Sequence, residues 1–292
     1  MTSPLFIIRY RWRILKIAAF NFPKAIELFK NPIRSTIKII FGKTPLIVYK
    51  DGHSFKSFNP FKFYGIRSLP YAEFVYNLAD KEVRIIHAER GDVEEVFEHE
   101  CYSWLPVKDR IVLDVGANVG DSSVYFAIKG AKHVHAFEIV PSTAQLCKEN
   151  VMGNDLGEIV TVHNIGIGNP RKVRIRSDLI ADGSYQVNDN VGGGEIEIKS
   201  MNHVVDELKI ADAVMKIDCE GCEYDVINPS NIELLKRFSH IIGEYHYHYG
   251  SLKKTLEDAG FSTWFSRPDP FYSPVNTPKE CWIGLFRASR RS

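Results

Sequence analysis

Residues 111–122 read Ile-Val-Leu-Asp-Val-Gly-Ala-Asn-Val-Gly-Asp-Ser, and this stretch decides the fold. An apolar run is followed by Asp114 and then by a short loop that contains Gly116 and Gly120. Residues 122–129 have helical character. This order predicts a β-strand, a tight turn and a helix N-terminus, and glycines in such a turn let a ligand approach the backbone closely.

The spacing within this loop separates two classes of cofactor. A dinucleotide site has the pattern G-x-G-x-x-G, shaped around a pyrophosphate. Here the pattern is Gly-Ala-Asn-Val-Gly, with Asp114 two residues before the first glycine. A carboxylate there would repel a pyrophosphate and attract a cationic ligand. S-adenosylmethionine carries an ammonium and a sulfonium group, so the loop predicts a methyl-donor site.

The charge of the chain is unevenly distributed. Its 292 residues are 45% hydrophobic and 25% charged, which is typical of a soluble globular protein, and a net charge of +1 argues against nucleic-acid binding. Residues 1–43 contain nine Lys or Arg and one Glu, a charge of +8, which leaves −7 for the rest. This basic segment predicts short amphipathic helices that contact a membrane surface or an acidic partner. The alternative is a helical appendage packed on the main domain.

Two further features predict a cytoplasmic protein. No run approaches the roughly 18 to 20 apolar residues that a membrane-spanning helix needs, and the N-terminal apolar stretches are too short and too often broken by arginine for a signal peptide. The five cysteines are an odd set without a framework pattern, so we expect reduced thiols.

Two domains are predicted, an N-terminal extension at 1–94 and a nucleotide-binding-like domain at 95–292. The extension combines the basic segment with a β-hairpin at 45–58, with Asp51-Gly52 at its turn. In the second domain, strands are predicted at 111–115, 133–137, 159–164, 213–217, 240–245, 261–265 and 281–286, and a two-stranded excursion at 171–200. Helices separate most of these strands, which predicts an α/β fold with a mostly parallel seven-stranded sheet and an antiparallel last strand. This is the Rossmann-like class I methyltransferase arrangement.

Ligands of open α/β sheets bind beyond the carboxyl ends of the strands. Glu138 ends the second strand, where an acid can accept both hydroxyls of a ribose. Asn164 and Ile165 end the third strand and form a possible edge for an adenine ring. The predicted cofactor-binding residues are Asp114, Gly116, Ala117, Asn118, Gly120, Asp121, Ser122, Glu138, Ile139, Asn164, Ile165 and Asp218.

Taken together and in order, these motifs resemble the FkbM family of S-adenosylmethionine-dependent methyltransferases. The resemblance is carried by 113–122, 136–138, 215–223 and 243–246, and it extends over roughly two thirds of the chain. Its distinguishing part is the Asp-x-Glu-Gly-x-Glu element at 218–223. The resemblance implies transfer of a methyl group to a hydroxyl, often of a sugar or polyketide, while residues 1–94 match nothing in it.

A hydroxyl acceptor needs a base within hydrogen-bond reach. The candidates are Asp218, Glu220, Glu244 and His246, of which His246 is preferred because the ordinary pKa of histidine is near neutrality. An extended strand would place Glu244, His246 and His248 on one face. The alternative is that both imidazoles are only packed at the rim of the site.

Two other interpretations concern the same region. Asp218, Glu220 and the two histidines could hold a metal ion, but their spacing matches no short metal motif, so no metal is predicted. Cys219 and Cys222 lack the second ligand pair that zinc would need, so they are interpreted as small, partly buried thiols.

The predicted function is therefore S-adenosylmethionine-dependent O-methylation of a hydroxyl on a sugar, glycolipid or related metabolite. Methylation of a nitrogen or a carboxyl group is the first alternative. A non-catalytic protein that binds a membrane or partner through a methyltransferase fold is the second. The sequence does not indicate the oligomeric state.

Overall fold

The computed structural model describes residues 33–34, 37–38, 46–48, 54–56, 72–79, 81–88, 93–176, 193–266 and 283–290. The chain divides into two compact units, Met1–Ser68 with Asp269–Lys279, and Leu69–Pro268 with Glu280–Ser292. Most of the basic segment 1–43 lies outside the described residues, so its contact with a membrane or partner stays a prediction. In the described part of the chain, no helix is long and apolar enough to cross a membrane.

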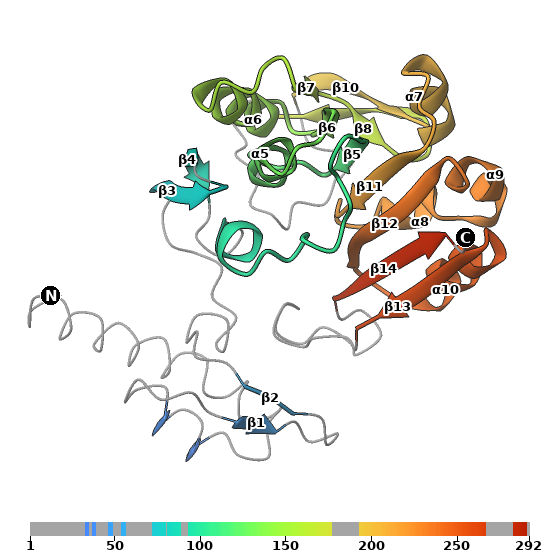
Figure 1. Cartoon of the computed structure of the whole chain (residues 1–292). Helices are drawn as coiled ribbons and strands as arrows, with labels where there is room; N and C mark the ends of the chain where they lie inside the picture. The colour runs from blue at the N-terminus through green and yellow to red at the C-terminus, as the bar shows by residue number, and fades with distance from the viewer. Residues whose placement is uncertain are drawn as a thin grey trace, which may run out of the picture. The chain divides into compact units, whose positions relative to one another are not determined.

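A seven-stranded sheet forms the centre of the second unit (Figure 1). Its strands, in spatial order, are β13 (Phe261–Phe265), β14 (Gly284–Arg290), β12 (Phe238–Tyr245), β11 (Ala213–Ile217), β5 (Ile111–Val115), β6 (His133–Phe137) and β7 (Val160–His163). The five strands from β12 to β7 pair in parallel, and β14 is antiparallel to both of its neighbours. The predicted fold class is therefore confirmed.

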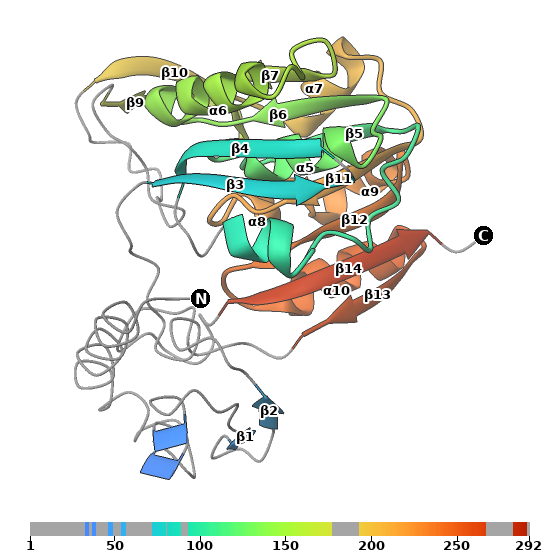
Figure 2. The same cartoon turned by 60° about the vertical axis from the view of Figure 1, so that its left-hand side comes forward.

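Helices cover both faces of this sheet (Figure 2). They are α5 (Asp121–Ile128), α6 (Pro141–Gly153), α7 (Met201–Glu207), α8 (Glu223–Val226), α9 (Ile232–Leu235) and α10 (Tyr249–Asp258), with a π-helical segment at Glu94–Glu98 and a 3-10 turn at Pro229–Asn231. Along β5 the side chains alternate between two buried clusters. Val112 packs with residues of α5 and α6, whereas Leu113 and Val115 pack with residues of α7 and α10. This period of two is what a strand buried on both faces requires.

Four of the seven observed strands match the predicted ones in their bounds. The bounds of β5, β6, β11 and β13 coincide with the predicted ones, whereas β14 continues to Arg290. The polar residues at the end of β14 did not suggest a strand in the sequence. In the structure they pair with β12 and β13 and so extend the sheet.

Two small sheets were also predicted. Strands β1 (Leu46–Val48) and β2 (Ser54–Lys56) form the predicted antiparallel hairpin, whose turn lies outside the described residues. Strands β9 (Arg171–Ile175) and β10 (Gly194–Lys199) form the excursion, with β8 (Gly166–Ile167) added beside β10.

A second hairpin, β3 (Ala72–Leu78) and β4 (Lys81–Ala88), belongs to the methyltransferase unit rather than to the N-terminal extension. Val83 and Ile85 are fully buried in the cluster that contains α5 and α6. The side chain of Asn150 on α6 accepts the N–H of Ile86 at 2.7 Å and donates to the carbonyl oxygens of Ile86 and Val119 at 3.0 and 2.8 Å. The unit therefore begins before the predicted boundary at residue 95.

We expect replacement of Asn150 by alanine to lower the free energy of unfolding by about 2–4 kcal/mol, because it leaves the part-buried backbone groups of Ile86 and the buried carbonyl of Val119 without this partner. Asn154, one turn further along α6, makes similar bonds to Arg84 at an exposed position and serves as the matched control. Urea denaturation should show a clearly smaller loss for N154A. Equal losses in the two variants would contradict a buried role for Asn150.

Candidate active site

The loop between β5 and α5 is held against the end of β11. Gly116 has a φ of 78°, in the left-handed region, and a Cβ built there would lie 1.8 Å from the carbonyl oxygen of Asp218. Gly116 and Ala117 both donate their N–H groups to the carbonyl oxygen of Phe137, at 3.0 Å. The loop is thus fixed to both neighbouring strands, and only glycine fits at its first position.

A buried lysine joins the same two strands. Lys216 lies beside Asp114 in the parallel register of β11 and β5. Its Nζ atom is 3.3 Å from Asp114 Oδ1 and donates to the carbonyl oxygen of Gly116 at 2.6 Å. Burial acts to lower the pKa of Lys216, but the carboxylates of Asp114, Asp218 and Asp121 outweigh it and raise the pKa above its ordinary value. The lysine is therefore charged at neutral pH.

Sequence reasoning missed Lys216 as a site residue. The sequence did contain a signal, because Lys216 is the one charged residue of the apolar strand Ala213–Ile217. A lysine buried in a strand requires a partner, and this requirement would have indicated a nearby acid.

Asp114 is fully buried, and its carboxylate already has partners. Oδ2 accepts hydrogen bonds from Ser122 Oγ at 2.7 Å and Ser123 Oγ at 2.6 Å, while Oδ1 faces Lys216. The direct contact with a cationic ligand predicted for Asp114, and the cofactor contact predicted for Ser122, do not fit this burial. Both residues instead anchor the N-terminus of α5.

Glu138 at the end of β6 is suited to bind a diol. Its Oε2 accepts the N–H of Asn118 at 3.0 Å and its Oε1 accepts the N–H of Val140 at 2.8 Å. Each oxygen keeps acceptor capacity for a hydroxyl group, since a carboxylate offers about four lone-pair sites. Burial raises the pKa of Glu138, although these two backbone bonds act in the opposite direction. The observed carboxylate therefore fits the ribose of S-adenosylmethionine.

The residues predicted for the adenine edge lie beside Glu138. Asn164 donates its side-chain amide to the carbonyl oxygens of Glu138 and Ile139, at 2.9 and 3.1 Å, so it orients this segment. Ile139 and Ile165 are partly buried against neighbouring apolar clusters. Contact of this edge with an adenine ring stays a prediction, while the amide of Asn164 bonds to the backbone.

Asp121 is the first residue of α5 and is also buried. Burial raises the pKa of Asp121 from 3.8 to about 6, against the effect of the nearby Lys216.

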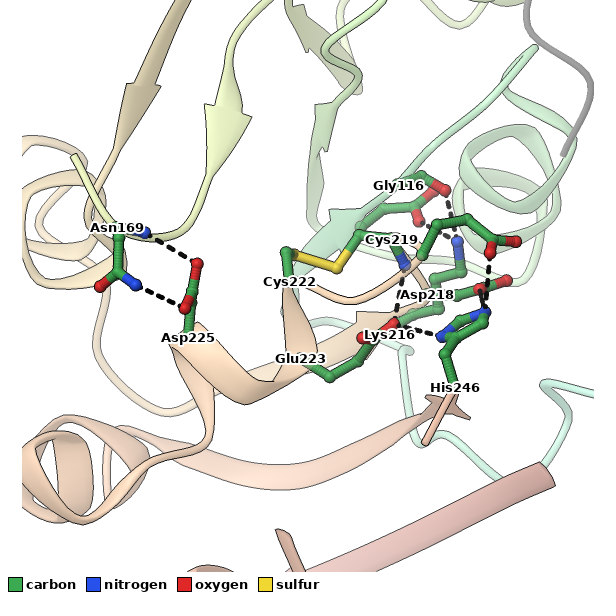
Figure 3. The surroundings of a disulfide bond; sticks show 11 residues. Gly116, Asn169, Lys216, Asp218, Cys219, Cys222, Glu223, Asp225 and His246 are labelled. Carbon is green, nitrogen blue, oxygen red and sulfur yellow. Dashed lines mark hydrogen bonds and ion pairs between the residues drawn. A yellow bond between two sulfur atoms is a disulfide. The ribbon is translucent and has the colours of Figure 1, made fainter. Parts of the chain in front are cut away.

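At the carboxyl ends of β11 and β12, three carboxylates surround one imidazole nitrogen. Figure 3 shows this imidazole, of His246, with Asp218 and Glu223 beside it. His246 Nε2 lies 3.4 Å from Glu220 Oε2, 3.8 Å from Asp218 Oδ1 and 3.9 Å from Glu244 Oε2. The four predicted catalytic residues are therefore brought together. The side chain of His246 is 2% exposed, whereas those of Asp218 and Glu220 are 27% and 13% exposed.

Glu223, which sequence reasoning did not select, orients this imidazole from its other side. Its Oε1 lies 3.0 Å from His246 Nδ1 and accepts the N–H of Cys219 at 3.1 Å. Burial acts to lower the pKa of His246, but Glu220 and Glu223 raise it well above the ordinary value. These acids stabilise the charged form of the imidazole, so the role of His246 as the base stays a prediction.

His248 does not join the cluster. Strand β12 ends at Tyr245, and His248 is the exposed residue that precedes the first residue of α10. The predicted face of Glu244, His246 and His248 assumed an extended chain, whereas the backbone bends directly after the strand.

Cys219 and Cys222 form a disulfide, contrary to the predicted reduced thiols (Figure 3). It spans Glu220 and Gly221, which have φ angles of 56° and 121°. Since a positive φ is costly for glutamate, the crosslink helps to keep Glu220 in its observed conformation. Only the tertiary structure showed that the two side chains turn toward each other.

The glycine loop, the buried acid Glu138 and the acidic strand ends are the features of a methyltransferase domain. The sequence pattern of the Methyltransferase FkbM domain matches residues 114–263, half of the chain, and the protein belongs to this family. Its cofactor is S-adenosylmethionine, in agreement with the fit of Glu138.

Other similarities are more distant. Protein arginine N-methyltransferase 1.1 of Arabidopsis thaliana is 45% identical over 56 residues, which cover 19% of this chain and 14% of that protein. The chain thus matches about one seventh of this curated relative.

Among solved structures, a precorrin-6y C5,15-methyltransferase from Geobacter metallireducens has a TM-score of 0.36 at 12% identity, covering 63% of this chain and 82% of that one. A putative methyltransferase complexed with S-adenosylhomocysteine has a TM-score of 0.43 at 10% identity, with coverages of 89% and 65%. At these TM-scores, neither likeness indicates a substrate.

We expect Gly116→Ala to lower the free energy of unfolding by about 3 kcal/mol or more, because a left-handed alanine costs about 1–2 kcal/mol and its Cβ would also overlap a backbone oxygen. Gly153→Ala, where the Cβ would meet open space, is the control and should change stability by less than about 1 kcal/mol. Chemical denaturation measures both. A neutral G116A variant would show that the two loops are not in close contact.

Asp121 should make the cofactor-free protein less stable as the pH rises from 4 to 6. The native pKa of about 6 lies above the ordinary 3.8, so the folded state binds the proton more tightly and loses this advantage on deprotonation, at a cost on the order of 3 kcal/mol or less. Thermal melts across this range should fall more steeply for the wild type than for D121N. Surface variant D258N should behave as wild type, and parallel curves for wild type and D121N would refute the assignment.

Proposed function

We propose that the protein catalyses S-adenosylmethionine-dependent O-methylation of a hydroxyl group on a sugar, glycolipid or related metabolite. The observation that carries this proposal is the cluster of Asp218, Glu220, Glu244 and His246 beside the cofactor loop. The carbonyl oxygen of Asp218 packs on Gly116, so the acidic cluster directly adjoins the cofactor-binding loop. Carboxylates next to a methyl donor suit an acceptor that must lose a proton as it reacts.

The bound cofactor supplies an electrophilic methyl group on a sulfonium. The chain's own residues hold the two reactants together, which contributes much of the acceleration in such transfers. Glu138 and Asn118 form the diol-binding end of the site. Glu220 is the proposed base, because it is more exposed than His246 and is held in place by the loop that the disulfide closes. The acceptor oxygen gains the methyl group, its proton passes to the Glu220 carboxylate, and the sulfonium becomes a thioether.

Methylation of nitrogen or of a carboxyl group uses the same cofactor and is the alternative outcome. A carboxyl acceptor needs no base, because it reacts as the anion, and the cluster of carboxylates would repel it. Those two points favour a hydroxyl over a carboxyl group as the acceptor.

Calorimetric titration with S-adenosylmethionine tests the cofactor site first. We expect binding to the wild type and about a 10- to 100-fold weaker affinity for Glu138→Gln, because the charged acceptor of two ribose hydroxyls is lost. Glu233→Gln, an 85% exposed acid on α9, is the control and should bind normally. Absence of binding to the folded wild type would favour the non-catalytic alternative.

Transfer of radioactive methyl groups to a panel of sugars and glycolipids tests the reaction. The labelled product should survive mild base, as an ether does and an ester does not. Glu220→Gln should lower kcat by about 10²–10⁴-fold with little change in cofactor affinity. An unchanged kcat in this variant would eliminate Glu220 as the base, and a base-labile product would establish carboxyl methylation.

A further inference from the structure

The geometry points to a divalent metal site formed by Asp218, Glu244 and His246 at the carboxyl ends of β11 and β12. One oxygen or nitrogen from each residue lies within 4.8 Å of the others. Binding of the acceptor hydroxyl by this ion rests on the proposed function. The metal site itself is independent of the proposed function.

The distances around His246 suit ligands of a shared ion better than hydrogen-bond partners. Its Nε2 makes no hydrogen bond, and the three facing oxygens, of Asp218, Glu220 and Glu244, are 3.4 to 3.9 Å away. Hydrogen bonds between nitrogen and oxygen are usually about 2.9 Å long. Two ligands of an octahedral ion with bonds of about 2.1 Å lie about 3.0 Å apart when adjacent and about 4.2 Å apart when opposite. The separations observed between Nε2 and the three oxygens fall between these limits.

The imidazole is also oriented as a metal ligand would be. Glu223 is fully buried and lies 3.0 Å from Nδ1, on the side away from the three acids. A carboxylate on one ring nitrogen favours the proton there and leaves the lone pair of the other nitrogen for a metal. Glu223 is in turn held by the backbone of Cys219, so Nε2 is aimed at the carboxylates by a supported side chain.

The local charge adds a second argument. Three carboxylates face one nitrogen atom of a side chain that is 2% exposed. The nearby Lys216 is already engaged, by Asp114 and by the carbonyl oxygen of Gly116. Partly buried carboxylates at such short separations repel one another unless a positive charge lies among them. The charged form of His246 places one positive charge there, and a divalent ion that displaces the Nε2 proton places two.

The mixed ligand set indicates the kind of ion. Carboxylate oxygens suit Mg²⁺ and Mn²⁺, whereas imidazole suits Zn²⁺ and other transition metals. Two carboxylates with one imidazole therefore favour Mn²⁺ or Zn²⁺ over Mg²⁺. Sequence spacing did not predict this site, because its ligands come from the ends of two different strands.

A bound ion would activate the acceptor directly. Coordination lowers the pKa of a hydroxyl group, and Glu220, which is outside the set of three, is placed to receive the proton. The ion would also fix the acceptor oxygen beside the cofactor loop.

The test uses the full chain after treatment with EDTA and removal of the chelator. Titration with MnCl₂ alone, without cofactor or acceptor, is followed by electron paramagnetic resonance of the free ion and repeated with ZnCl₂ by calorimetry. We expect one site per chain for at least one of the two ions. Affinity should fall at least tenfold in Asp218→Asn, Glu244→Gln and His246→Gln, and should not change in Asp258→Asn.

A cooperative thermal unfolding transition serves as the control that each variant is folded. In the wild type, a rise in Tm on addition of the metal is a second measure of binding that requires no variant. Glu223→Gln should lower the affinity for the metal by about 10- to 100-fold, because His246 loses the carboxylate that orients it. Absence of one-to-one binding in the wild type, or an affinity equal to that of the wild type in the three ligand variants, would overturn the metal site.

Failure of this proposal is distinguishable from failure of the proposed function. Methyl transfer to a hydroxyl that is unaffected by EDTA would refute the metal and leave the reaction standing. Stoichiometric binding of Mn²⁺ or Zn²⁺ by a protein that methylates no hydroxyl would support the metal site and refute the reaction.

Discussion

The buried ion pair between Lys216 and Asp114 is the interaction on which the arrangement of the site depends. It joins the two central strands on one face of the sheet, and the same lysine holds the carbonyl oxygen of Gly116. Asp114 in turn accepts hydrogen bonds from two serines in the first turn of α5. One buried contact thus places the cofactor loop, the first helix and the end of β11 relative to one another. Such a pair is costly to desolvate, and its hydrogen bonds are what make it tolerable.

The second constraint is the loop from Asp218 to Glu223. It begins where Asp218 packs on Gly116, bends through two residues with positive φ, and is closed by the disulfide. Glu223 then leads into α8 and supports His246 from beneath the cluster. Asp218 and Glu220 are therefore held by a short, crosslinked segment. A rigid segment suits a site whose geometry must be kept while reactants bind and leave.

The local sequence determined the sheet and the family. Alternation and apolar runs located β5, β6, β11 and β13, because strands buried on both faces tolerate few polar residues. The order of Asp114, Glu138 and Asp218 at successive strand ends identified the cofactor class, since parallel strands bring their carboxyl ends to one edge. The same reasoning gathered Asp218, Glu220, Glu244 and His246 correctly.

Only the tertiary structure decided what these groups do to one another. Whether Asp114 faces a ligand or a lysine depends on the register between β5 and β11, which no local pattern specifies. The acids that surround His246, the pairing of Cys219 with Cys222 and the exclusion of His248 depend on where the chain bends after a strand. The sequence by itself therefore determined the fold and the residues at its active edge, because periodicity and strand order are local. The partners of those residues were decided by packing, because burial, charge and distance arise only when separate strands meet.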